Sequence, residues 1–94
     1  MDPTFVRAKL IEVLAAVQRD SGYSPVEING STCPLDDLEG FDSKIWPVAI
    51  AQLAKEAGIA IPDRKNIFVS PDGRRRLTID QIVIGVCALA SHAA

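Results

Sequence analysis

Hydrophobic residues recur at helical spacing in three segments of the chain. In residues 3–20 one apolar stripe comprises Val6, Leu10, Val13, Leu14 and Val17. The charged and amide side chains that fall mainly off this stripe are Arg7, Lys9, Glu12, Gln18 and Arg19. Asp2 and Pro3 are typical of a helix start, and Gly22 is typical of a helix end. The pattern therefore predicts a helix from Pro3 to about Asp20.

A second apolar stripe predicts a helix over roughly residues 43–57. Its members are Trp46, Ile50, Leu53, Ala54 and Ala57. Gly58 ends the stripe and Pro62 prevents its continuation. Pro47 stands near its beginning, where the proline ring opposes a regular helical turn. We therefore expect either a loosened first turn or a helix that begins nearer Trp46.

A third stripe follows Thr78 and Gln81, whose spacing is that of a capping box. Its apolar face comprises Ile79, Ile82, Val83, Val86, Leu89 and Ala90. Before it, residues 67–69 form a short β-like run and Pro71, Asp72 and Gly73 indicate a turn. We expect a tight hairpin or loop that returns through three arginines, residues 74–76.

A long connection, residues 23–42, separates the first two stripes. Its apolar anchors are Val26, Ile28, Leu35, Leu38 and Phe41. A loop of this length inside a compact domain is usually functional or held by anchors of its own. We therefore predict an all-α fold, a small up-and-down bundle of three main helices. A short fourth helix fits in either connection.

The composition fits a single domain over residues 1–94. Hydrophobic residues make up 48% and charged residues 23% of the chain, which excludes wholesale disorder. The net charge of −2 disfavours a nucleic-acid partner, because such binding needs an excess of Lys and Arg. No signal-peptide pattern is visible, and the longest apolar stretch is nine residues. We expect a cytoplasmic monomer that does not enter a membrane.

Few residues offer catalytic or metal-binding chemistry. The single histidine, His92, lies at the end of the third stripe, so no nucleophile has a base beside it. Cys33 and Cys87 are far apart in the chain and fit a reducing compartment, and no metal-ligand spacing occurs. Glycine-rich phosphate loops are absent. We therefore expect neither an enzyme acting alone nor a metal centre.

Two polar features each allow two interpretations. The arginines 74–76 fit a solvated turn flank, or contact with a phosphate group or an acidic partner. Asp42 and Ser43 precede the second stripe, and plain capping explains both, because Asp and Ser are favoured at helix starts. The residues around Asp42 and Ser43 indicate whether this pair has a function beyond helix capping.

Those surroundings resemble the acyl carrier protein family. Residues 38–43 read Leu-Glu-Gly-Phe-Asp-Ser, and residues 57–62 read Ala-Gly-Ile-Ala-Ile-Pro. Members of the family carry a leucine, a short turn, Asp-Ser, a helix and a similar Gly-Ile-x-Ile-Pro exit. The spacing from Asp42 to Pro62 matches that pattern without a gap. The first helix, the long loop and the last helix correspond as well, so the resemblance covers nearly the whole chain.

The resemblance implies that a separate phosphopantetheinyl transferase attaches 4′-phosphopantetheine from coenzyme A to Ser43, and that Asp42 helps to present this serine. A phosphodiester at a helix N-terminus meets unpaired N–H groups and the positive end of the helix dipole. The protein would then be a carrier of acyl or aminoacyl thioesters rather than a catalyst. Its partners would be the enzymes that load and use the cargo in fatty-acid or specialised metabolite biosynthesis.

Several positions depart from the family pattern. Lys44 stands where leucine is common, and Lys44 and Lys55 lie where the partner-facing helix is usually acidic. These departures favour a specialised stand-alone carrier outside central fatty-acid synthesis. The alternative is an unmodified interaction module on the same fold, in which Ser43 is only a cap. Its docking patch would comprise Lys44, Ile45, Trp46 and Val48. Trp46 is also explained as a core residue, because of its large apolar area.

Overall fold

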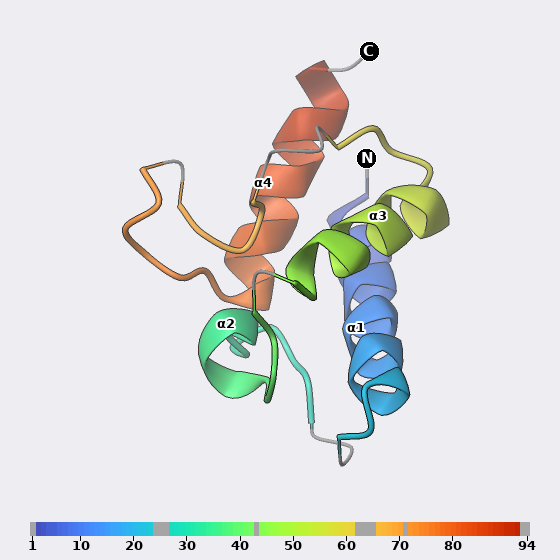
Figure 1. Cartoon of the computed structure of the whole chain (residues 1–94). Coiled ribbons are helices and arrows are strands. Elements are labelled where there is room, and N and C mark those ends of the chain that lie inside the picture. The colour runs from blue at the N-terminus through green and yellow to red at the C-terminus, as the bar shows by residue number, and fades with distance from the viewer. Residues whose placement is uncertain (1, 24–26, 43, 62–65, 71, 93–94) are drawn as a thin grey trace.

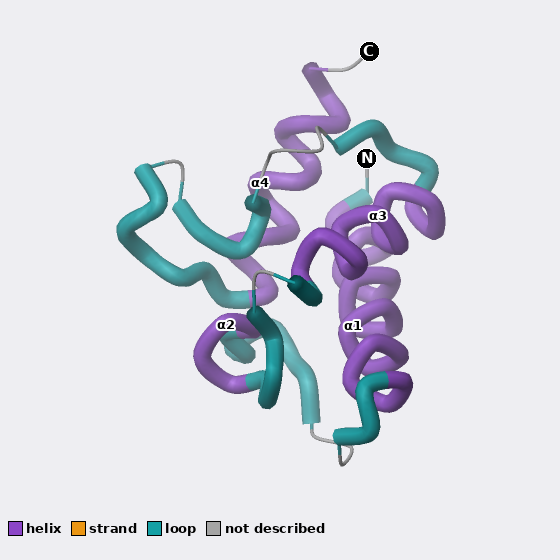
Figure 2. Tube along the Cα trace, viewed as in Figure 1, coloured by secondary structure: helices purple, strands orange, loops and turns teal. Residues whose placement is uncertain are grey.

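The computed structural model describes residues 2–23, 27–42, 44–61, 66–70 and 72–92. Within these ranges the chain forms four helices and no strand (Figures 1 and 2). The helices are α1 (Pro3–Asp20), α2 (Pro34–Asp37), α3 (Trp46–Ala57) and α4 (Ile79–His92). The all-α prediction is confirmed, and α2 is the short fourth helix, placed in the first connection. Roles were also predicted for Val26, Ser43, Pro62 and Pro71, which lie outside the described residues.

Helix α1 is the element against which both α3 and α4 pack. It begins as predicted, because the Asp2 carboxylate accepts the Thr4 N–H at 2.9 Å and Pro3 is the first helical residue. Gly22 follows its end with a φ of 84°, a conformation that favours glycine. Every residue of the predicted apolar stripe is buried.

One buried residue of α1 was not expected. Gln18 is only 4% exposed, although its polar side chain was placed mainly off the stripe. Its Nε2 donates a hydrogen bond to the Glu39 carbonyl oxygen at 2.9 Å. The glutamine is tolerated in the core because this bond replaces the one it would make to water. The sequence pattern carried no signal of this partner.

Helix α3 begins at Trp46, so the expected helix over residues 43–57 is one turn too long at its start. Pro47 is its second residue, where a missing N–H costs nothing because helix starts leave that group unpaired in any case. The alternative of a start nearer Trp46 is thus confirmed. Gly58 ends the helix with a φ of 68°.

Helix α4 begins with the predicted capping box. The Thr78 N–H donates to Gln81 Oε1 at 2.9 Å, and the Gln81 N–H donates to Thr78 Oγ1 at 3.4 Å. The Ile79 N–H donates to the Thr32 carbonyl at 2.8 Å. These bonds satisfy N–H groups that a helix start leaves without partners. The bond from the Ile79 N–H also ties the first connection to the start of α4.

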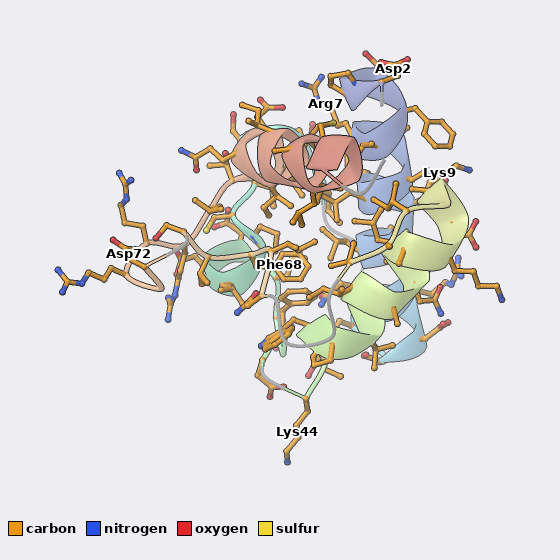
Figure 3. The ribbon with its side chains drawn as sticks, turned by 90° about the horizontal axis from the view of Figure 1, so that it is seen from above. Asp2, Arg7, Lys9, Lys44, Phe68 and Asp72 are labelled. Atoms are coloured by element: carbon orange, nitrogen blue, oxygen red, sulfur yellow. The ribbon has the colours of Figure 1, made fainter. Side chains whose placement is uncertain are left out.

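The core lies between α1, α3, α4 and the two connections. Leu38 and Phe41 are each 5% exposed and anchor the first connection, as predicted. Ile28 and Leu35 are half-buried and pack against the same core. In the second connection Phe68 is fully buried and lies near the middle of the molecule (Figure 3). The predicted hairpin is reduced to a single bridge between Val69 and Arg76.

Candidate functional site

Asp42 lies exposed at the point where the first connection enters α3. Its carboxylate oxygen Oδ1 accepts the Lys44 N–H at 2.9 Å. Its carbonyl oxygen accepts the N–H groups of Ile45 at 3.0 Å and Trp46 at 2.9 Å. Asp42 therefore caps the turn that precedes α3, whereas the N-cap position of the helix itself is taken by Ile45. Ser43, the predicted attachment residue, lies outside the described residues.

The segment that carries Asp42 is held in place by contacts from three directions. The Phe41 ring meets the Phe68 ring edge to face, with centroids 4.9 Å apart and an interplanar angle of 85°. The Gln18 side chain binds the Glu39 carbonyl. Gly40 lies against the phenol ring of Tyr23 with a φ of 68°. Asp42 is therefore an exposed residue on a fixed support.

Gly40 provides a test of this support. Gly40→Ala should lower the free energy of unfolding by about 2 kcal/mol, because a Cβ there both adopts a left-handed φ and meets the Tyr23 ring. Gly58 has the same φ of 68° but open space around the Cβ position, so Gly58→Ala should cost about 1 kcal/mol. Urea denaturation of both variants measures the difference. Equal losses would show that Tyr23 does not restrain Gly40.

The predicted docking patch does not form one exposed surface. Lys44 and Val48 are exposed, Val48 at 49%, and the Lys44 side chain projects away from the ribbon (Figure 3). Ile45 and Trp46 are instead half-buried and pack against the core. The structure thus supports the core explanation of Trp46 over a role as a fully exposed docking residue.

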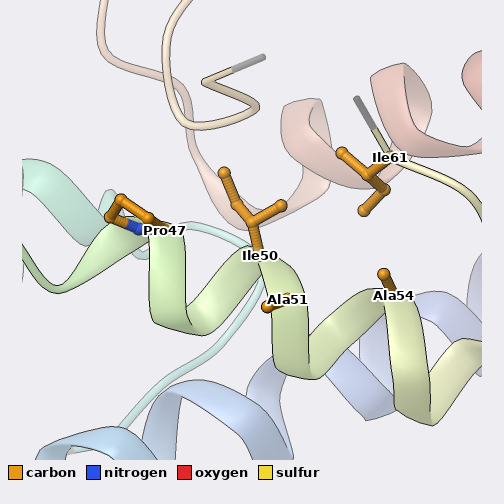
Figure 4. A pocket seen from close by; sticks show the side chains of 5 residues that line it. All are labelled: Pro47, Ile50, Ala51, Ala54 and Ile61. Carbon is orange, nitrogen blue, oxygen red and sulfur yellow. The ribbon is translucent and has the colours of Figure 1, made fainter. Parts of the chain in front are cut away.

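An apolar hollow that the sequence analysis missed lies along α3. It has a volume of about 330 Å³ and is lined by Pro47, Ile50, Ala51, Ala54 and Ile61. Ile50, Ala54 and Ile61 project toward the same space (Figure 4). The alanines leave this space because their side chains are short. Their positions in the stripe were visible in the sequence, but the approach of Ile61 depends on the path of the chain after Gly58.

A shallower groove lies on the exposed side of α3. Its volume is about 350 Å³, and its lining comprises Val48, Ala51, Gln52, Lys55 and Glu56. Ala51 lines both the groove and the apolar hollow, so the two adjoin. The groove mixes apolar and charged side chains, whereas every side chain of the hollow is apolar.

The cysteines show no sign of activation. Burial raises the pKa of the Cys33 thiol, and its hydrogen bond to the Asp36 carboxylate, at 3.4 Å, acts in the same direction. A thiol with a raised pKa is a poor nucleophile at neutral pH. Cys87 is half-buried and packs against the core.

The Asp36 carboxylate contacts the side chains of Arg76 and Cys33. The Arg76 guanidinium, followed by the Cys33 thiol, lowers the pKa of the Asp36 carboxyl below its usual value. Arg76 and Asp36 form an ion pair that connects the second connection to α2. Among the described residues, no group of three or more His, Cys, Asp and Glu side chains could hold a metal ion.

None of the described helices combines the length and the apolar character needed to span a membrane. Comparisons of the chain with known proteins found no matching family model, curated protein or solved structure.

Proposed function

We propose that this protein is an acyl or aminoacyl carrier whose cargo is held as a thioester on a 4′-phosphopantetheine arm attached to Ser43. The observation that carries the proposal is the placement of Asp42. It stands exposed on a segment fixed by Leu38 and Phe41, at the entrance to α3, immediately before the serine of the Asp-Ser pair. The resemblance to acyl carrier proteins requires an exposed residue in this place, since a separate enzyme must reach it.

The hydrogen bonds around the pair support the same role. The bond from the Lys44 N–H to the Asp42 carboxylate joins the residues on either side of position 43. Asp42 is the residue proposed to present the serine to the transferase. The exposed ammonium group of Lys44 would stand near the phosphodiester of the arm, where a positive charge is favourable. No catalytic step is assigned to this chain: the transferase and coenzyme A would supply the chemistry of attachment.

The order of helices supports an acyl-carrier-protein-like bundle. A first helix, a long connection with a short helix, a second main helix and a last helix follow one another as in that family. The second connection departs from the usual pattern, because its described residues form a bridged loop rather than a third short helix. The apolar hollow beside α3 would offer cover to an apolar cargo.

The partners we propose are a phosphopantetheinyl transferase and the enzymes that load and use the cargo. The departures at Lys44 and Lys55 favour a specialised pathway over central fatty-acid synthesis. The free thiols of Cys33 and Cys87 fit the reducing conditions of the cytoplasm. A carrier that visits several enzymes in turn is expected to act as a monomer, without nucleic acid or membrane as partner.

Intact-protein mass spectrometry tests the proposal. The purified chain is incubated with coenzyme A, Mg²⁺ and a broad-specificity phosphopantetheinyl transferase. We expect a mass gain of one phosphopantetheinyl group, absent in Ser43→Ala. Ser31→Ala is the matched control, because Ser31 is an exposed loop serine whose loss should leave the gain unchanged. A gain that persists in Ser43→Ala would refute the assignment of the site.

An unmodified interaction module is the second candidate. Val48 is 49% exposed beside a groove on α3, which is the observation in its favour. If several transferases leave the mass unchanged while circular dichroism confirms the fold, this candidate replaces the carrier. Ser43 would then be only a cap, and Val48 and Lys44 would be the first residues to substitute in a search for a docking surface.

A further inference from the structure

The second connection contains a bridged loop that projects from the helical bundle (Figure 1). Its two limbs are joined by the bridge between Val69 and Arg76, which consists of two backbone hydrogen bonds. The Ser70 N–H donates to the Arg75 carbonyl at 2.8 Å, and the Leu77 N–H donates to the Phe68 carbonyl at 2.9 Å. We call residues 68–70 and 72–77 the arginine hairpin. Its base is anchored by the buried ring of Phe68.

Side chains within the arginine hairpin fix the backbone of its tip. The Gly73 N–H donates to the Ser70 carbonyl at 2.8 Å, and the Ser70 hydroxyl donates to the Asp72 carboxylate. The Arg74 N–H donates to Asp72 Oδ1 at 3.0 Å, and the Arg75 N–H donates to Ser70 Oγ at 3.1 Å. The hydrogen bond from the Ser70 hydroxyl to the Asp72 carboxylate is the main reason that the pKa of this carboxyl lies below its usual value. These bonds connect Ser70 to residues 72–75, which include the consecutive arginines 74 and 75.

The three arginines of the hairpin have different surroundings. Arg76 forms the ion pair with Asp36 on α2 and so attaches the hairpin to the bundle. Arg74 and Arg75 are exposed, and in the part of the chain that the structure describes neither forms an ion pair with a carboxylate. The Asp72 carboxylate is used by the Ser70 hydroxyl and the Arg74 N–H within the turn. Arg75 also helps to lower the pKa of the Asp72 carboxyl through its charge, but without forming an ion pair, so both exposed guanidinium groups are accessible to a partner.

We propose that the arginine hairpin is a docking element that binds an acidic surface of a partner protein through Arg74 and Arg75. Guanidinium groups bind carboxylates with two parallel hydrogen bonds, and arginine is enriched among the residues that dominate protein interfaces. The hydrogen bonds among residues 70 and 72–75 lower the entropy lost on binding, because they already restrict these residues in the free protein.

Charge decides between an acidic protein and other anionic partners. The chain carries a net charge of −2, so it lacks the excess of Lys and Arg that binding to an extended phosphate backbone needs. Two arginines are also fewer than the clusters of basic residues that hold proteins to anionic lipids. An acidic patch of limited size fits a cationic tip on an otherwise acidic molecule. The proposal does not depend on modification of Ser43.

A titration followed by ¹H–¹⁵N NMR tests the proposal. The probe is a peptide of consecutive glutamates with blocked ends, added at low ionic strength. We expect the largest shifts at the amides of residues 72–76 and at the Nε–H groups of Arg74 and Arg75. Binding should weaken about tenfold in the double variant Arg74→Gln, Arg75→Gln, which loses both contacts. The spectrum of that variant without peptide shows whether its fold is unchanged.

The double variant Lys44→Gln, Lys55→Gln is the matched control, because it removes the same charge from two exposed side chains elsewhere. It should keep its affinity for the peptide within about twofold. Equal weakening in both double variants would overturn the proposal, since it would indicate an effect of net charge alone. Absence of shifts in the hairpin would also overturn it, as would tighter binding to a DNA duplex or to vesicles containing phosphatidylserine.

Discussion

Phe68→Ala should lower the free energy of unfolding by about 3–5 kcal/mol. The Phe68 side chain is 0% exposed, so its removal leaves a cavity as well as losing apolar burial. It also loses the edge-to-face contact with the Phe41 ring, whose centroid is 4.9 Å away. Small domains are stable by about 5–15 kcal/mol, so this one change removes a large share of the total.

The measurement is urea denaturation, with Phe5→Ala as the matched control. Phe5 is the same residue type but is 42% exposed. The Lys9 Nζ atom lies over its ring, 5.7 Å from the ring centroid. Removal of the Phe5 ring should cost about 1 kcal/mol or less. Similar losses in the two variants would contradict the central position of Phe68. Because Phe68 supports Phe41, Phe68→Ala should also slow the modification that we propose for Ser43.

Leu53→Ala should lower the free energy of unfolding by about 2–5 kcal/mol. Leu53 is 0% exposed and belongs to the buried face of α3, the helix that packs on α1. The opposite side of α3 is exposed, so the helix depends on this apolar face for its position. The expected loss of unfolding free energy is the sum of two costs. One is the lost transfer free energy of the removed methyl groups, and the other is the cost of the cavity that remains.

Val48→Ala is the control for Leu53→Ala, because Val48 lies on the same helix but is 49% exposed. Its change in unfolding free energy should stay within about 0.5 kcal/mol. Thermal unfolding followed by circular dichroism at 222 nm, together with urea denaturation, would measure both variants. If Leu53→Ala were as mild as Val48→Ala, the packing of α3 on α1 would not be the main contact that positions the helix.

The sequence determined most of the helices. The stripe of α1 and the capping box of α4 are local patterns, and neighbouring residues along the chain satisfy them. The bond between Thr78 and Gln81 spans only three residues, so no distant contact could change it. Gly22 and Gly58 likewise end their helices through their own backbone freedom.

The candidate site was determined by the sequence only in part. The hydrogen bond from the Lys44 N–H to the Asp42 carboxylate joins residues that are close in the sequence, so it can be predicted locally. The exposure of Lys44 and Val48 agrees with their positions off the buried stripe. Trp46 begins the predicted apolar stripe, so its packing against the core follows from the spacing, whereas that of Ile45 does not. The stripe left two possible starts for α3, and the structure has the later one, with Pro47 as the second helical residue.

Tertiary structure decided the features that join residues far apart in the chain. The burial of Gln18 depends on the carbonyl of Glu39, and the attachment of the arginine hairpin depends on Asp36. The apolar hollow exists because Ile61 passes over the short side chains of α3. Helical spacing and caps are local and can be read along the sequence. A buried polar pair, an ion pair between connections and a hollow require distant segments to meet, and only the packed fold brings them together.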